Sequence, residues 1–249
     1  MKTDLTSYLR GLSEYNPLAN KASEAMNKAV FAIGFILLTM FLLLEMMQWY
    51  RFVRQQNGRV PQQVWLELAF IYAACYSLLF FSSPILDGMM WLLDRGAAAI
   101  MATVKMEDFT YSFDLGTVRG LERMILSLIG GIVELIVWLV VKLVLFIRFV
   151  ELYLLKALAP VFLAAMVNET TRPIAINYLK YFASYVLISL VMSAMVVIFP
   201  VFMEGGKILL LKDFSPVGMQ TAIISIVQGI VYIIFIIGAG RKTQRLLGV

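Results

Sequence analysis

Long apolar runs alternate with short polar segments along the chain. A helix that crosses a bilayer needs about 20 predominantly apolar residues, and five segments supply that length. The pattern therefore predicts an all-α fold, a polytopic transmembrane helical bundle with about five spans. Ser82-Ser83-Pro84 is expected to end or kink the second span. The predicted spans are 29–47, 64–86, 124–147, 181–203 and 217–240.

One further apolar segment, 152–167, is only 16 residues long and contains Pro160. It falls short of a full span, and a proline inside a helix removes a backbone donor and clashes with the preceding turn. We therefore predict a broken or re-entrant helix on the cytoplasmic side; the alternative is a sixth span. Charges flank both ends, so the segment is also predicted to be a docking surface for a partner. The residues assigned to this surface are Arg148, Glu151, Lys156, Pro160, Glu169 and Arg172.

Two basic clusters predict how the chain is oriented in the membrane. Cytoplasmic loops of membrane proteins are enriched in Lys and Arg. Arg51, Arg54 and Arg59 follow the first predicted span, and a second cluster at 241–245 follows the last. Five spans place both clusters on the same side. We therefore predict that the N-terminus lies outside and the C-terminus lies in the cytoplasm.

The same spans predict the domain organisation. Residues 1–28 are polar and are predicted to form an external, amphipathic N-terminal segment. Residues 29–249 are predicted to form a single transmembrane domain. Its largest polar segment, 87–123, is predicted to be an external loop that contains Asp87, Asp94 and a helix lying along the membrane surface.

Composition supports a membrane protein and narrows its chemistry. Hydrophobic residues make up 61% of the chain and charged residues 15%, and the mean hydropathy is +0.85. There is no histidine, and Cys75 is the single cysteine. This excludes disulfides within one chain, Cys/His zinc sites and Ser-His or Cys-His nucleophile pairs. The net charge of +5 agrees with basic cytoplasmic loops. We predict no catalytic, cofactor-binding or metal-binding residues, and no cofactor.

Glu134, Trp138 and Lys142 form a polar stripe within the third predicted span. Steps of four residues keep the three side chains on one helical face. An ionisable residue in hydrocarbon costs about 2.5–3.5 kcal/mol on insertion scales, so such residues face a partner helix or a water-filled cavity. One interpretation is a face that lines a lumen or a proton path. The other is a contact between helices, with Lys142 extending towards the cytoplasmic side.

Small and aromatic residues indicate how the spans pack and where they meet the headgroups. Gly34 lies in the first span, where it allows a second helix to approach closely. Trp49, Tyr50, Trp65 and Trp91 lie at predicted interfaces between membrane and water. Their position is typical of an aromatic belt.

Residues 148–185 read RFVELYLLKALAPVFLAAMVNETTRPIAINYLKYFASY. A helix rich in leucine and aromatic residues is interrupted at Ala159-Pro160, a charged turn at 168–172 follows, and 177–180 leads into the next span. The start of the chain adds a polar helix, a first span and an Arg-rich loop. This order resembles the TrbL-type polytopic inner-membrane subunit of type IV secretion and conjugal transfer systems, in its compact Gram-positive-like form. The resemblance covers roughly 20–245.

The resemblance implies a non-enzymatic membrane channel or scaffold subunit of a type IV secretion machine for conjugative DNA transfer. It implies a bacterial cytoplasmic (inner) membrane location. It also implies partners: a secretion ATPase, other membrane subunits of the transfer machine, and a transient contact with the transferred DNA–relaxase. Scattered small residues and few polar groups further predict a homo-oligomer. The residues alone leave two alternatives: a small secondary transporter or ion-coupled permease, or an accessory assembly protein without a pore.

Overall fold

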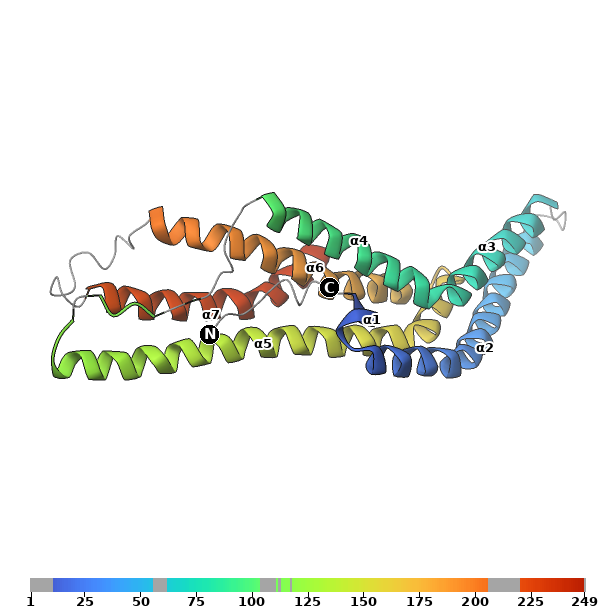
Figure 1. Cartoon of the computed structure of the whole chain (residues 1–249). Helices are drawn as coiled ribbons and strands as arrows, with labels where there is room; N and C mark the ends of the chain where they lie inside the picture. The colour runs from blue at the N-terminus through green and yellow to red at the C-terminus, as the bar shows by residue number, and fades with distance from the viewer. Residues whose placement is uncertain are drawn as a thin grey trace. The chain divides into compact units, whose positions relative to one another are not determined.

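The computed structural model describes residues 11–55, 62–103, 111, 113–116, 118–205 and 220–248. These residues form helices and no strand (Figure 1), so the predicted all-α fold is confirmed. The elements are α1 (Leu12–Tyr15), α2 (Pro17–Gln55), α3 (Gln62–Phe80), α4 (Ser82–Thr103), α5 (Leu121–Leu163), the 3-10 helix η2 (Ala164–Met166), α6 (Arg172–Gly205) and α7 (Gln220–Leu247).

The predicted number of spans is also confirmed. In the part of the chain that the structure describes, four helical segments are long and apolar enough to cross a membrane, and a bent pair of helices supplies a fifth if it counts as one span. The four segments are Pro17–Arg54, Leu121–Met166, Arg172–Met195 and Thr221–Leu247, and the bent pair is Trp65–Phe80 with Ser82–Ile100. The chain is therefore a multi-pass membrane protein.

The bent pair accounts for the second predicted span. Its two helices meet at Phe81 with a bend of 70°, so the expected kink at Ser82-Ser83-Pro84 is confirmed. Pro84 lies in the first turn of α4, where a missing N–H removes no helical hydrogen bond. Asp87 and Asp94 consequently lie in a helix rather than in a loop. The external side assigned to 87–123 stays a prediction.

Helix α5 corrects the interpretation of the segment 152–167. The third predicted span and this segment form one continuous helix, which passes Pro160 and continues into η2. A separate broken or re-entrant helix at 152–167 is therefore wrong, and the break lies between α3 and α4 instead.

Neighbouring side chains explain why the helix continues past the proline. Pro160 has no N–H to donate to the carbonyl of Lys156, four residues earlier. The Asn27 side-chain amide donates to that carbonyl instead, at 2.7 Å. The Tyr178 hydroxyl donates to the adjacent carbonyl of Leu155, also at 2.7 Å. Because side chains satisfy both carbonyls, the interruption costs α5 less than a proline does in an isolated helix.

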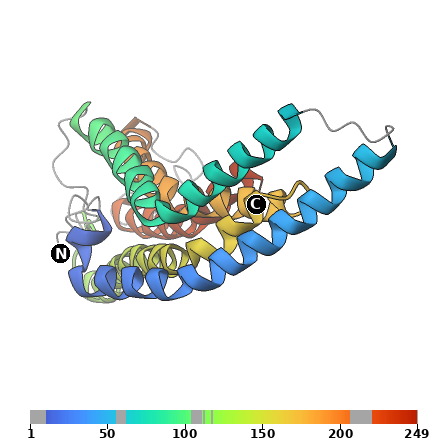
Figure 2. The ribbon, with the colours of Figure 1, turned by 90° about the vertical axis from the view of Figure 1, so that its right-hand side faces the viewer.

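The chain divides into two compact units, and α4, α5 and α6 each contribute residues to both. One unit, here the hairpin unit, comprises Gly11–Leu92, Val150–Val186 and Leu247–Val249. In it, α2 and α3 pack together as a helical hairpin, and η2 contacts both (Figure 2). The side chain of Asn16 starts α2 by accepting hydrogen bonds from the backbone N–H groups of Leu18 and Ala19, each at 3.1 Å.

In the described part of the chain, the other unit lies within Leu93–Phe149 and Leu187–Leu246, and we call it the α7 unit. In this unit, residues of the segment that precedes α5 form hydrogen bonds to α7. The Tyr111 hydroxyl donates to the carbonyl of Ser225 at 2.6 Å, and the backbone N–H of Asp114 donates to the Ser225 hydroxyl at 3.2 Å. Burial raises the pKa of Tyr111, which keeps this donor protonated. Gly229 leaves the space that the Tyr111 ring occupies.

At Gly34, α2 passes close to the backbone of α5. A Cβ added at Gly34 would lie 2.6 Å from the carbonyl oxygen of Pro160 and 2.8 Å from its carbonyl carbon. Backbone atoms cannot move aside as the end of a flexible side chain can. The close approach predicted for Gly34 is therefore confirmed, and its neighbour is the proline turn of α5.

We predict that Gly34→Ala destabilises the protein by about 1–3 kcal/mol, the usual cost of overpacking. Thermal unfolding of the purified protein in mild detergent measures the effect. Gly131→Ala is the matched control, because a Cβ there meets nothing within 4 Å, and it should leave the melting temperature unchanged or raise it. Equal melting temperatures for the two variants would contradict the close contact at Pro160.

Candidate functional site

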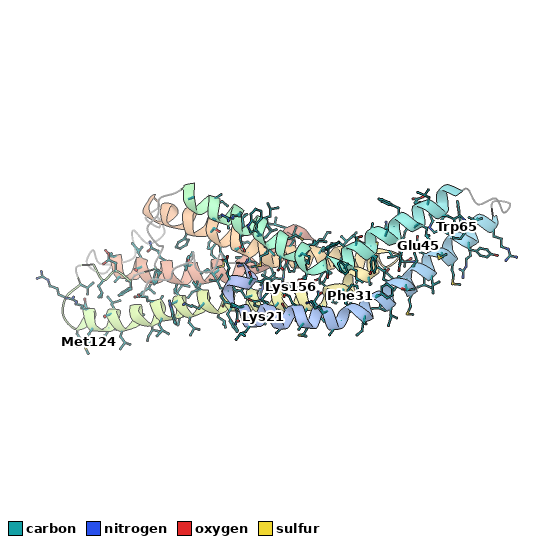
Figure 3. The ribbon with its side chains drawn as sticks, turned by 45° about the vertical axis from the view of Figure 1, so that its right-hand side comes forward. Lys21, Phe31, Glu45, Trp65, Met124 and Lys156 are labelled. Atoms are coloured by element: carbon teal, nitrogen blue, oxygen red, sulfur yellow. The ribbon has the colours of Figure 1, made fainter. Side chains whose placement is uncertain are left out.

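Lys156 is the centre of a polar cluster inside the hairpin unit. Its side chain is fully buried, and its ammonium nitrogen lies 2.8 Å from each carboxylate oxygen of Asp87. It also donates to the side-chain oxygen of Asn20 at 2.9 Å and to Glu24 at 3.4 Å. The cluster therefore joins α2, α4 and α5 through one cation, the Lys156 that is labelled in Figure 3.

The two acids of this cluster are only partly enclosed. The side chains of Asp87 and Glu24 keep 43% and 40% of their exposed area, while the side chain of Lys156 keeps none. The lysine has therefore lost its hydration completely, and the carboxylates have lost about half of theirs. Three oxygen-bearing partners replace the water that the ammonium group has given up.

Arg148 forms a second ion pair, inside the α7 unit. Its guanidinium lies 3.3 Å from one carboxylate oxygen of Asp94, and both side chains are buried. The Ser189 hydroxyl donates to the same oxygen at 3.1 Å. This pair connects α4, α5 and α6. Unlike the Lys156 cluster, both of its charges are desolvated, so each depends on the other.

Glu45 of α2 holds the turn that precedes α6. One of its carboxylate oxygens accepts the backbone N–H of Glu169 at 3.3 Å, and the other accepts the indole N–H of Trp49 at 3.2 Å. The turn is closed further by Asn168, whose side-chain oxygen accepts the backbone N–H of Thr170 at 2.9 Å. Glu45 is buried, and its contacts lie inside the hairpin unit.

The structure separates the residues predicted to form a docking surface. Arg148, Lys156 and Pro160 lie inside the chain, where they contact its own residues. Glu169 is exposed, and Arg172 is half-buried. The guanidinium of Arg172 donates to the carbonyl of Met166 at 3.4 Å. Glu151 is half-buried on α5.

The predicted stripe on α5 keeps its helical spacing. Glu134 and Trp138 are half-buried, and Lys142 is exposed. The ammonium of Lys142 lies 5.2 Å from the centre of the Trp138 ring, which is a cation–π contact. A lumen or a proton path along this stripe stays a prediction.

Sequence analysis missed Asp87 and Asp94 as the partners of the buried cations. A periodic signal was present: the two acids are seven residues apart, and Lys156 and Arg148 are eight apart. Each spacing corresponds to two helical turns and puts both charges on one face of its helix. The signal was lost because the acids were assigned to a loop.

The polar clusters can hold helices together in hydrocarbon, and this is the chemistry that their geometry supports. Lys156 is satisfied by acids and by the amide oxygen of Asn20, and Arg148 is satisfied by Asp94, all from other helices. Among the residues that the structure describes, no three His, Cys, Asp or Glu side chains are grouped so that they could bind a metal ion. Cys75 is buried in α3.

Long apolar helices joined by buried ion pairs define a polytopic helical membrane protein. The chain matches the family model described as TrbL/VirB6 plasmid conjugal transfer protein over residues 66–242, and it belongs to this family. The match confirms the resemblance seen in the sequence and makes the chain a component of conjugal transfer and type IV secretion. Comparisons with curated proteins and with solved structures gave no match.

We predict that Arg148→Leu destabilises the protein by about 3–5 kcal/mol, because it leaves the Asp94 carboxylate buried without its cation. Denaturant titration in mixed micelles measures the free energy of unfolding. Lys156→Leu should cost less, since Asp87 and Glu24 are already partly exposed. The double variant Arg148→Leu/Asp94→Leu should recover part of the loss. A double variant less stable than Arg148→Leu would contradict the inference that the loss comes from burying the Asp94 carboxylate without Arg148.

Proposed function

We propose that the protein is a non-enzymatic channel or scaffold subunit of a conjugative type IV secretion machine in the bacterial cytoplasmic membrane. The observation that supports this proposal most directly is the family match over 66–242, which includes α4, α5 and α6, the helices that carry both buried ion pairs. The proposed partners are a secretion ATPase, other membrane subunits of the machine, further copies of this chain and, transiently, the transferred DNA–relaxase.

The charges inside the helices favour a structural subunit over a secondary transporter. A transporter of ions or solutes uses intramembrane charges to bind its cargo near the middle of the bilayer. Here Lys156 and Arg148 are engaged by acids of the same chain. Glu169 and Arg172, at the turn before α6, remain the best placed of the proposed docking residues, since their side chains reach the surface.

The proposal is tested by removing the gene from its conjugative element and measuring transfer from donor cells. We expect transfer to be lost and to be restored by the intact gene. Crosslinking during mating, followed by precipitation of the protein, should recover the transferred strand if the chain lines the path. Transfer at the normal frequency without the gene would refute the proposal. Loss of transfer without recovery of DNA would favour the scaffold role over the channel role.

The proposed topology has the N-terminus outside and the C-terminus in the cytoplasm, with the bent pair α3–α4 acting as one span. In a Cys75→Ser background, single cysteines at exposed positions test this order. A cysteine at 122 should react with an impermeant reagent added outside. Cysteines at 170 and 245 should react only after the membrane is opened. The reverse pattern would contradict the proposed topology.

A further inference from the structure

The helical hairpin of α2 and α3 contains an open pocket of about 770 Å³. Its walls are mainly apolar: Leu43, Met46 and Met47 of α2 contribute to them, and Leu68 of α3 lies opposite. The volume is in the range of pockets that bind small molecules, about 300–1,000 Å³. The pocket belongs to the hairpin unit alone.

Two arginines lie where α2 approaches its end. Arg51 and Arg54 both line the pocket and are exposed. A spacing of three residues puts them on the same side of the helix. Neither forms an ion pair with any residue in the described part of the chain. The pocket therefore combines an apolar wall with two cations that have no anion from this hairpin.

Aromatic side chains mark the same end of the pocket. Trp49, Tyr50 and Trp65 line it, and Figure 3 shows Trp65 on α3 together with Glu45 on α2. The indole of Trp49 is fixed, because its N–H donates to Glu45 at 3.2 Å. Tryptophan and tyrosine at the end of a membrane helix lie at the level of the lipid headgroups. The arginines are therefore placed where lipid phosphates lie.

We propose that this pocket binds an acidic phospholipid, with an acyl chain along Leu43, Met46 and Leu68 and the phosphate between Arg51 and Arg54. The guanidinium group binds phosphate through two parallel hydrogen bonds, and basic pockets between membrane helices bind anionic headgroups. The proposal rests on the membrane location of the chain and not on its role in secretion.

The length of the apolar wall supports a lipid as the occupant. Leu43 and Arg54 are eleven residues apart, which corresponds to about 16 Å along a helix. One leaflet of a bilayer has a hydrocarbon thickness of about 15 Å. The distance from the apolar end of the pocket to the cations therefore matches the distance from the middle of the bilayer to the headgroups.

Tryptophan fluorescence provides a direct test, because two of the four tryptophans line the pocket. The full chain with Trp91→Phe and Trp138→Phe keeps only Trp49 and Trp65 as emitters. It is reconstituted into phosphatidylcholine vesicles, and the mole fraction of lipid that carries brominated acyl chains is increased in steps. The bromines quench a tryptophan that they contact. The brominated lipid is either phosphatidylglycerol or phosphatidylcholine, with bromine at the same carbons.

We expect brominated phosphatidylglycerol to quench at about one-tenth or less of the mole fraction that phosphatidylcholine needs, because each arginine near the surface favours an anionic lipid. Arg51→Gln/Arg54→Gln should remove this preference. Arg241→Gln/Arg245→Gln is the matched control. This variant removes two exposed arginines from the end of α7 and should keep the preference for phosphatidylglycerol. High salt should weaken the preference for phosphatidylglycerol in the protein with intact arginines.

Three results would overturn the proposal. Equal quenching by the two lipids in the protein with intact arginines would show that no headgroup is recognised. The same loss of preference in both arginine variants would show a general charge effect. Absence of quenching by either lipid would show that protein covers the pocket, and crosslinking through a cysteine at position 50 would then distinguish a second copy of this chain from another partner. None of these results depends on DNA transfer.

Discussion

The architecture depends on keeping charged side chains inside apolar helices without leaving any of them uncompensated. A lone ammonium in hydrocarbon is expensive, and Lys156 is fully buried. The hairpin unit meets this constraint by supplying Asp87, Glu24 and Asn20 from two other helices. The cation is thus tolerated only if α2, α4 and α5 come together. A residue that would destabilise a single span consequently makes the association of three helices specific.

The proline turn and the lysine cluster belong to the same contact. The side chain of Lys156 receives acids, and its carbonyl, freed by Pro160, receives the Asn27 amide. Asn27 also lies 3.4 Å from the hydroxyl of Ser82, at the start of α4. Gly34 allows the backbone of α2 to pass directly over Pro160. The ion pairs of Lys156, the hydrogen bond to its carbonyl and the close contact at Gly34 therefore all stabilise the packing of α2 against the last turns of α5.

Sequence analysis predicted the parts of this fold that depend on hydrophobic length. Apolar runs of about 20 residues indicate spans whatever their neighbours are, and the kink near Pro84 follows from local backbone chemistry. The continuity of α5 could not be predicted in the same way, because it depends on Asn27 and Tyr178, which lie far away in the sequence. Pro160 alone indicated a break. Its effect is decided by whether another helix supplies a donor for the freed carbonyl of Lys156.

The candidate site could also be predicted only in part, because charged residues can be read from the sequence but their distant partners cannot. Glu134 was recognisable as unusual because it is charged within an apolar run, whereas Arg148 and Lys156 were interpreted as charges that flank a docking segment. Their partners were missed, since Asp87 and Asp94 follow a kink and were assigned to an external loop. The pocket of the hairpin unit required the structure as well. Its cations and aromatic residues are close in sequence, but its opposite wall comes from α3.

The unbroken course of α5 creates a mismatch with the thickness of the bilayer. The helix has 43 residues, and at 1.5 Å per residue it is about 64 Å long. A tilt of 40°, at the upper end for membrane helices, accommodates about 39 Å of helix in a hydrocarbon core of about 30 Å. That distance corresponds to about 26 residues. Both ends of α5 nevertheless carry exposed apolar side chains, including Leu121 and Leu154. A single copy in a flat bilayer leaves part of this apolar surface in contact with headgroups or water, and the surface is covered only where the membrane thickens or another protein lies against it.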